Sequence, residues 1–450
     1  MSNKAKFLTI FLISNLLLNC SFDNKTGIWS GSKKEKDRIS ELERKQKEKI
    51  DVVNIYSYSN EYKKEIIAKK NSILSKPKKN ASWQMSGMNL QNYLGNIYLP
   101  KIDNKFLKKK IGKDKFKISK VVTPPVTNNE NIFFSDDVGT IYSVNLRGGI
   151  NWKLNIYKKM YNRIYKNLTF SIYKDKIFVA DNIGFIYAIN LNSGKLAWVK
   201  NLRVPLKSNI KIYKDQIFLV NQDNRLLCLD VEKGLKIWDI RSIKSFIKSQ
   251  YFLALAISKN GDLVVLNSSN DLVKIQAKSG RIYWSVNIID AISTHESDFF
   301  KSSDIVIADT DVIFSTSTSI FSYNLNTGYR NWVENIGSKN IPIIDGSNVF
   351  SITDNGFLVN LDRKTGKVNW STNILKILKR KNQITEISGF IMGSGKIYAV
   401  TSNGYLIVSS ASSGKVEYSK KIGDPIETSP IISNGSLFIL TANSKIFGFN

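Results

Sequence analysis

From about Val121 to the end of the chain, the pattern of apolar and polar residues repeats itself. Each copy begins with a β-branched or aromatic run that contains two adjacent apolar residues. The eight pairs are spaced 37 to 49 residues apart: Ile132-Phe133, Ile177-Phe178, Ile217-Phe218, Leu263-Val264, Val312-Ile313, Val349-Phe350, Ile397-Tyr398 and Leu437-Phe438. A period near about 40 residues with strand-like composition is typical of β-propeller blades. A helical solenoid would instead place apolar residues every three to four positions, a spacing that the repeats lack.

Every copy also follows the same order of strands and turns. A polar turn such as Asp181–Gly184 precedes an alternating strand such as Phe185–Asn190, and a second turn ends in glycine. An aromatic residue follows that glycine by four positions in six copies and by three in the first. The pairs are Gly149/Trp152, Gly194/Trp198, Gly234/Trp238, Gly280/Trp284, Gly328/Trp332, Gly366/Trp370 and Gly414/Tyr418. This pattern predicts antiparallel hairpins, positive φ at the glycine and an aromatic side chain packed between neighbouring blades.

The copies contain eight first hairpins but only seven glycine–aromatic strands, because the chain stops at Phe447–Asn450. A ring without bare sheet edges needs another strand at that point, since exposed edges favour aggregation. Phe106–Gly112 resembles the outer strands of other copies, such as Tyr418–Gly423. We therefore predict an all-β fold, a single eight-bladed β-propeller of four-stranded antiparallel blades that an N-terminal strand closes.

The repeats resemble those of the PQQ-like propeller family. The clearest matches are Thr327-Gly328 with Trp332, and Leu361-Asp362 followed by Thr365-Gly366 and Trp370. The resemblance covers about residues 81–450.

The first twenty residues have the pattern of an export signal. Two lysines precede Phe7–Leu18, an apolar run too short to span a bilayer stably. The run ends in Leu17-Leu18-Asn19-Cys20, which resembles a bacterial lipobox, although Asn19 is not one of its usual small residues. The resemblance implies cleavage before Cys20 and lipidation of that residue, and Ser21 after the cysteine favours the outer membrane. The alternative is a cleaved signal peptide with an incidental cysteine.

Residues 21–80 differ in composition from the repeats. They hold 16 Lys and Arg and 9 Asp and Glu, and they lack a broad apolar stripe. We predict a signal peptide over residues 1–19, a lipid-anchored charged tether over 20–80 and the propeller over 81–450.

Composition excludes several kinds of chemistry. The chain has one histidine, His295, and two cysteines, Cys20 and Cys228, too few for a Cys/His zinc site or a disulfide framework. The net charge of +29 comes from 66 basic and 37 acidic residues, but only 11 of the basic residues are Arg. Nucleic-acid sites favour Arg and a concentrated basic face, whereas this charge is spread along the chain. We predict no catalytic residue, metal, cofactor or nucleic-acid partner.

The signal peptide, lipobox, tether and propeller together resemble the BamB family of outer-membrane lipoproteins. Ala81–Gly87 also resembles the W-x-x-x-G opening that precedes the propeller in that family. The resemblance implies a non-catalytic scaffold of the β-barrel assembly machinery that binds the POTRA domains of BamA and helps deliver unfolded barrel proteins. It also implies that two mid-chain loops, Arg241–Gln250 and Asp290–Ser303, contact BamA. The side chains that match are Phe246, Ile247, Lys248, Glu296 and Asp298.

Two other functions remain open. A propeller adaptor for another envelope partner has the same sequence features, because a fold does not fix a function. A PQQ-dependent dehydrogenase is less favoured, because such enzymes usually carry an adjacent Cys-Cys pair that this chain lacks.

Overall fold

The computed structural model describes residues 62–115, 123–241, 253–288, 302–378 and 385–450, together with positions 21–22, 29–30, 37, 40–41 and 44. The chain forms two compact units, Met1–Asn60 and Glu61–Asn450. In the first unit, β1 (Ser21–Phe22) pairs antiparallel with β2 (Trp29–Ser30). None of the helices within the described residues is both long enough and apolar enough to cross a membrane.

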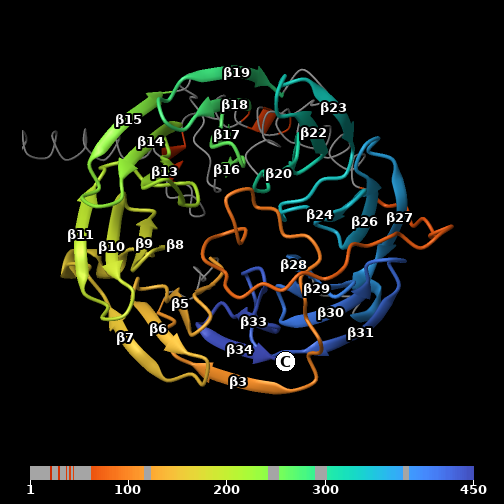
Figure 1. Ribbon diagram of the computed structural model, residues 1–450, viewed down its shortest axis with the longest axis horizontal. Helices are drawn as coiled ribbons and strands as arrows, with labels where there is room; N and C mark the ends of the chain where they lie inside the picture. The colour runs from red at the N-terminus through yellow and green to blue at the C-terminus, as the bar shows by residue number, and fades with distance from the viewer. Residues whose placement is uncertain are drawn as a thin grey trace, which may run out of the picture. The chain divides into compact units, whose positions relative to one another are not determined.

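The second unit is a ring of eight four-stranded antiparallel sheets (Figure 1). Blade 1 contains β4 (Val126–Thr127), β5 (Asn131–Ser135), β6 (Ile141–Asn145) and β7 (Ile150–Leu154), and blade 2 contains β8 (Leu168–Tyr173), β9 (Lys176–Asp181), β10 (Phe185–Asn190) and β11 (Leu196–Asn201). Blade 3 contains β12 (Lys211–Tyr213), β13 (Gln216–Val220), β14 (Arg225–Asp230) and β15 (Lys236–Arg241), and blade 4 contains β16 (Ala254–Ile257), β17 (Asp262–Leu266), β18 (Asp271–Gln276) and β19 (Ile282–Asn287). Blade 5 contains β20 (Val306–Ala308), β21 (Asp311–Ser315), β22 (Ile320–Asn324) and β23 (Arg330–Glu334). Blade 6 contains β24 (Ile343–Asp345), β25 (Asn348–Ile352), β26 (Phe357–Asp362) and β27 (Val368–Asn373). Blade 7 contains β28 (Ile387–Gly393), β29 (Lys396–Thr401), β30 (Tyr405–Ser410) and β31 (Val416–Lys421). Two 3₁₀ helices, η1 (Lys159–Arg163) and η4 (Ile374–Leu378), follow β7 and β27.

The eighth blade joins the two ends of the repeat region. It contains β32 (Ile431–Ser433), β33 (Ser436–Leu440) and β34 (Lys445–Phe449), and its fourth strand is β3 (Lys105–Lys110). β3 pairs antiparallel with β34, from Lys105 opposite Phe449 to Lys110 opposite Lys445. The predicted eight-bladed ring, closed by an N-terminal strand, is confirmed.

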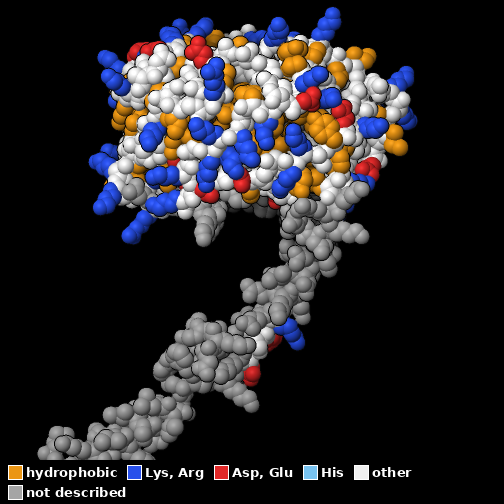
Figure 2. Space-filling view, turned by 90° about the horizontal axis from the view of Figure 1, so that it is seen from below, with side chains coloured by type: hydrophobic (Ala, Val, Ile, Leu, Met, Phe, Trp, Pro, Cys, Tyr) orange, Lys and Arg blue, Asp and Glu red, His pale blue; other side chains and the backbone are white. Residues whose placement is uncertain are grey.

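Burial decreases from the channel towards the rim of each blade. In blade 3, four of the five residues of β13 are buried, whereas none of the six residues of β15 is. The inner strands are apolar on both faces because each lies between two neighbouring blades. The outermost strands have few buried residues because they form the outer edge of each blade, where Lys and Arg side chains are spread over the surface (Figure 2).

A β-bulge recurs where the third strand of a blade pairs with the fourth. It falls between Ala188 and Ile189 in blade 2 and between Cys228 and Leu229 in blade 3. Blades 1, 4, 5, 6 and 7 each have a bulge at the equivalent place. The residue just before the bulge lies opposite the aromatic residue of the outermost strand, as Ala188 does with Trp198. Bulges re-aim nearby side chains, and here the side chain next to the bulge is the one that reaches the following blade.

The structure corrects the spacing of the first glycine–aromatic pair. The residue with positive φ in that turn is Gly148 (φ 82°), not Gly149. A Cβ added to Gly149 would meet the Asn145 side chain. Gly148 stands four residues before Trp152, so blade 1 has the same spacing as the others. The sequence misassigned it because two glycines are adjacent.

Candidate functional site

The N-terminal residues before β3 cross the inside of the ring. We call residues 75–97 the plug segment; its trace is the orange loop inside the ring in Figure 1. Backbone hydrogen bonds join it to the inner hairpins of blades 1, 2, 4, 5, 7 and 8. These bonds are Trp83 N to Thr127 O (2.9 Å), Ile172 N to Gln84 O (2.7 Å), Ile257 N to Leu90 O (2.8 Å), Ile307 N to Gln91 O (2.9 Å), Ser394 N to Ile97 O (2.8 Å) and Asn434 N to Asn80 O (2.7 Å).

Blades 3 and 6 hold the plug segment through side chains instead. Ser75 N donates to the Asp345 carboxylate at 2.9 Å in blade 6. In blade 3, the Lys211 ammonium donates to Ser86 O (2.8 Å), Asn89 O (2.7 Å) and Asn92 Oδ1 (2.6 Å). All eight blades therefore bind one continuous segment, which couples the ring around its axis.

Lys211 is fully buried, and its three donors meet three acceptors of the plug segment. Asn92, also fully buried, accepts from Lys211 and donates to Leu255 O (3.2 Å) and Ile305 O (2.7 Å). The Asp304 carboxylate nearby accepts from Asn209 Nδ2 at 2.7 Å. A buried charge is tolerated when hydrogen bonds replace its hydration, and this network supplies them.

Burial shifts both ionisable groups of this network towards their neutral forms. It lowers the pKa of Lys211 to about 7, which the Asp304 charge partly opposes. It raises the pKa of Asp304 to about 6, against the opposing effects of Lys211 and Asn209. Perturbed groups mark functional sites in some proteins and structural networks in others. Here every Lys211 donor meets the plug segment, so we interpret it as a positioning residue.

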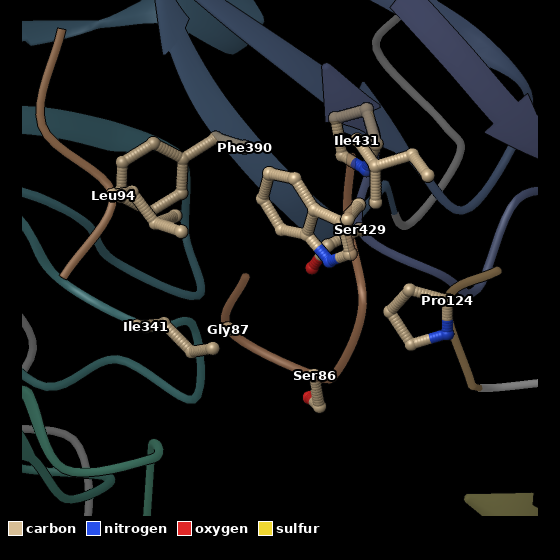
Figure 3. A pocket seen from close by; sticks show the side chains of 10 residues that line it. Ser86, Gly87, Leu94, Pro124, Ile341, Phe390, Ser429 and Ile431 are labelled. Carbon is tan, nitrogen blue, oxygen red and sulfur yellow. The ribbon is translucent and has the colours of Figure 1, made fainter. Parts of the chain in front are cut away.

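A small cavity lies where the plug segment meets blades 6, 7 and 8. Figure 3 shows Ser86, Gly87 and Leu94 of the plug segment around it, opposite residues of the blades. Those blade and linker residues are Pro124, Ile341, Phe390, Ser429, Pro430 and Ile431. Its volume is about 40 Å³. Trp83 also lines the cavity; it is 4% exposed, and its Nε1 donor has no partner among the described residues. The site has room for a few water molecules, one of which would satisfy this donor.

The rim aromatics link each blade to the next. In blades 1 to 5 the Trp Nε1 donates to a backbone carbonyl of the following blade: Trp152 to Leu191 (2.9 Å), Trp198 to Val231 (3.1 Å), Trp238 to Ala277 (3.1 Å), Trp284 to Leu325 (3.0 Å) and Trp332 to Arg363 (2.8 Å). The turn glycine of the following blade lies against the indole, so a Cβ on Gly366 would come within 2.8 Å of the Trp332 ring. In blade 7 the aromatic is Tyr418, which is 38% exposed.

Blade 6 differs because another part of the chain covers its outer edge. Ile66 and Ser371 exchange backbone hydrogen bonds of 3.0 and 2.9 Å, and the Tyr62 hydroxyl donates to Ser371 Oγ. Trp370 Nε1 donates to Ser72 Oγ at 3.0 Å instead of to a carbonyl of blade 7, and Trp370 is fully buried. We call residues 62–74 the strap. The strap and residues 75–80 of the plug segment therefore contact the ring. Both lie within residues 20–80, which the sequence predicts to be a tether.

The other predicted site residues fall in different places. Cys20, the lipidation residue, and the five partner-binding residues Phe246, Ile247, Lys248, Glu296 and Asp298 lie outside the described residues. Cys228 is fully buried in β14, and burial raises the pKa of its thiol to about 12, which makes it a poor nucleophile. The residues that sequence reasoning missed are Lys211, Asn92 and the strap. The Trp83-to-Gly87 opening motif was the signal that pointed to this part of the chain.

The ring, the rim tryptophans and the closing N-terminal strand define a PQQ-like eight-bladed β-propeller. The model of the family described as outer membrane protein assembly factor BamB matches residues 139–372, more than half of the chain. The chain belongs to this family.

Solved structures of two kinds share the fold. BamB from Moraxella catarrhalis has a TM-score of 0.60 at 11% identity, covering 76% of this chain and 100% of that one. Quinohemoprotein alcohol dehydrogenase from Comamonas testosteroni has a TM-score of 0.65 at 11% identity, covering 82% and 80%. A europium-containing methanol dehydrogenase has a TM-score of 0.61 at 10% identity, covering 82% and 89%. Such low identities show a common fold and no more. No curated protein matches the sequence significantly.

Proposed function

We propose that the protein is a non-catalytic scaffold of outer-membrane β-barrel assembly, anchored by lipid at Cys20 on the periplasmic face of the outer membrane. Its partners would be the POTRA domains of a BamA-like protein and unfolded barrel clients. The observation that carries the proposal is the match of residues 139–372 to a family described as an outer-membrane assembly factor. The lipobox-like sequence before Cys20 supports the anchor.

A membrane capture experiment tests this function. The full-length protein is crosslinked in intact cells, purified, and its partners are identified by mass spectrometry. We expect a large outer-membrane β-barrel protein with POTRA domains. Recovery of an unrelated envelope enzyme or cell-wall factor instead would favour the adaptor function.

Charge reversal then tests the predicted contact loops. Lys248→Glu is expected to weaken capture several-fold, since charged pairs at interfaces contribute about 1 kcal/mol or more. Lys153→Glu, on the outer strand of blade 1, is the control with the same charge change. If capture survives reversal of Lys248, Glu296 and Asp298 together, the contact lies elsewhere on the protein.

A Cys20→Ala variant tests the anchor. Metabolic labelling with an alkyne fatty acid is expected to mark the unsubstituted protein and not the variant. Labelling that persists in the variant would move the anchor to another residue.

A quinone-dependent dehydrogenase is the second candidate, because the similar structures include dehydrogenases. The residues inside the ring do not fit that cofactor. The plug segment crosses the inside of the ring, and the cavity of about 40 Å³ beside it is too small for a tricyclic quinone. The described residues also contain no group of three or more His, Cys, Asp or Glu that could hold a metal ion. A quinone absorbance in the purified protein, or alcohol oxidation that depends on calcium, would overturn the scaffold proposal.

A further inference from the structure

The hairpin turns of blades 2 and 3 have the same three-residue sequence and hold their lysines in the same way. Tyr173-Lys174-Asp175 in blade 2 corresponds to Tyr213-Lys214-Asp215 in blade 3, and both lysines have positive φ. Each lysine also lies over the preceding tyrosine ring, at 5.3 Å for Lys174 and 5.2 Å for Lys214. The turns differ at their aspartates, since Asp215 has positive φ (60°) and Asp175 does not. The two lysines are nevertheless held alike, so we compare what the following blade presents to each of them.

Between blades 2 and 3, acidic residues of blade 3 meet the lysines of blade 2. Lys174 pairs with Asp215 at 2.6 Å, and Lys176 pairs with Glu232 at 3.4 Å. Asp215 comes from the first turn of blade 3 and Glu232 from its last turn.

Between blades 3 and 4, the corresponding carboxylates are absent. Asn260 stands in the turn that corresponds to that of Asp215, Lys278 stands at the position of Glu232, and Gln216 replaces Lys176. Within the described residues, neither Lys214 nor Lys278 has an ion pair. The nearby Asp262 is engaged by Lys274 at 3.2 Å. Two exposed ammonium groups thus remain uncompensated on one groove.

The groove between these blades is open. Its cavity of about 520 Å³ is lined by residues that include Lys214, Lys278, Asn260, Gln216 and the rings of Tyr213 and Tyr283. The Asp262 carboxylate also lines it, but this charge is compensated by Lys274. This volume lies in the range of small-ligand sites, roughly 300–1,000 Å³. The tyrosines give amphipathic walls, which favour a peptide over a bare inorganic ion.

We propose that this groove binds an acidic segment of a partner protein, whose carboxylates take the places that Asp215 and Glu232 occupy one blade earlier. The groove is formed by the turns at which the inner strands end. It involves none of the residues predicted to bind a BamA-like partner. The proposal is thus independent of the proposed assembly function.

Fluorescence anisotropy with labelled hexaglutamate tests the site on the full-length protein, with labelled hexaglutamine as the neutral control. We expect hexaglutamate to bind at least about tenfold more tightly, and Lys214→Glu with Lys278→Glu to weaken it about tenfold, since each charged contact contributes roughly 0.5–1 kcal/mol. Lys153→Glu with Lys195→Glu makes the same charge change on blades 1 and 2 and is expected to change the affinity less than about twofold.

A second variant rebuilds the blade 2–3 arrangement in the groove. Asn260→Asp with Lys278→Glu supplies internal carboxylates, so we expect hexaglutamate binding to fall by about tenfold while the fold is retained. The melting temperature checks retention of the fold.

Three results would overturn the proposal. Equal loss in the Lys153/Lys195 control would mean attraction to the whole basic surface. Unchanged binding in both groove variants would place the peptide elsewhere. Binding of lipopolysaccharide micelles, but not of hexaglutamate, that depends on Lys214 and Lys278 would make the ligand a phosphorylated glycolipid.

Discussion

At the scale of single residues, the Lys211 ammonium connects blade 3 to the plug segment through three hydrogen bonds. Replacing it removes all three donors and leaves buried acceptors unpaired. We expect Lys211→Met to lower the free energy of unfolding by about 3 kcal/mol. Lys214→Met, three residues later and exposed, is the control and should change it by less than about 0.5 kcal/mol. Denaturant unfolding of both variants measures the difference.

The same residue gives the stability a pH dependence. Because burial lowers the pKa of Lys211 to about 7, the unfolded chain, with an ordinary Lys pKa near about 10.4, binds more protons between these values. The penalty of burying the charge is therefore complete below pH 7 and is relieved as the pH rises. Asp304 acts at lower pH. Its pKa is raised to about 6, so its contribution to the free energy of unfolding decreases as the pH rises from about 4 to 6. We expect stability to rise between pH 7 and 9 more in the unsubstituted protein than in Lys211→Met; parallel curves would contradict this.

Two alanine substitutions test the contact between the rim glycine Gly366 and the preceding blade, with Gly346, in the turn between β24 and β25, as the control. Gly366 and Gly346 both have positive φ, so alanine is strained at either position. Only at Gly366 would the new Cβ meet the Trp332 ring, at 2.8 Å, while at Gly346 no atom lies within 4 Å. We expect Gly366→Ala to lower the free energy of unfolding by about 1–3 kcal/mol more than Gly346→Ala. Equal effects would mean that the inter-blade contact adds little to the strain.

At the scale of elements, the strap pairs with the outer edge of blade 6. Ile66→Pro removes the N–H that donates to Ser371 O, whereas Ile67→Pro places the same ring on a residue whose side chain is 91% exposed. We expect Ile66→Pro to speed hydrogen exchange at the Ser371 amide at least about tenfold, since local opening controls exchange. Ile67→Pro should leave it nearly unchanged. Similar exchange in both variants would show that the side-chain contacts of Tyr62 and Ser72 hold the strap without the backbone pair.

At the scale of the whole molecule, stability depends on closing the ring at blade 8. Leu107 is the buried residue of β3, at 3% exposed, while Lys108 is exposed. Leu107→Asp buries an unpaired carboxylate, so we expect a loss of about 3 kcal/mol or more and faster exchange of β34 amides. Lys108→Asp should have little effect. If β34 exchange rises equally in both variants, the closure depends on the backbone ladder and not on the Leu107 side chain.

The repeated part of the molecule was predictable because each blade uses local rules. The apolar pairs, the turn residues and the glycine–aromatic spacing all lie within a single copy. The same features recur from copy to copy, so each copy independently supports the same prediction of a blade. The missing outer strand was visible for the same reason. Even the misassigned Gly149 was an error of one residue within a correctly predicted turn.

The sequence by itself therefore determined the blades, their number and the strand that closes them, since hydrogen bonding and alternation act over short distances along the chain. Only the tertiary structure decided that residues 62–97 cover an edge of blade 6 and cross the inside of the ring. That segment does not repeat, and its backbone partners in the ring are 44 (Trp83 to Thr127) to 354 (Asn80 to Asn434) residues away in the sequence. The groove between blades 3 and 4 was also hidden, because an uncompensated charge is visible only when the neighbouring blade is in place. The period of the sequence specifies the blade, whereas tertiary packing decides which residues of other blades and of the N-terminal segment each blade contacts.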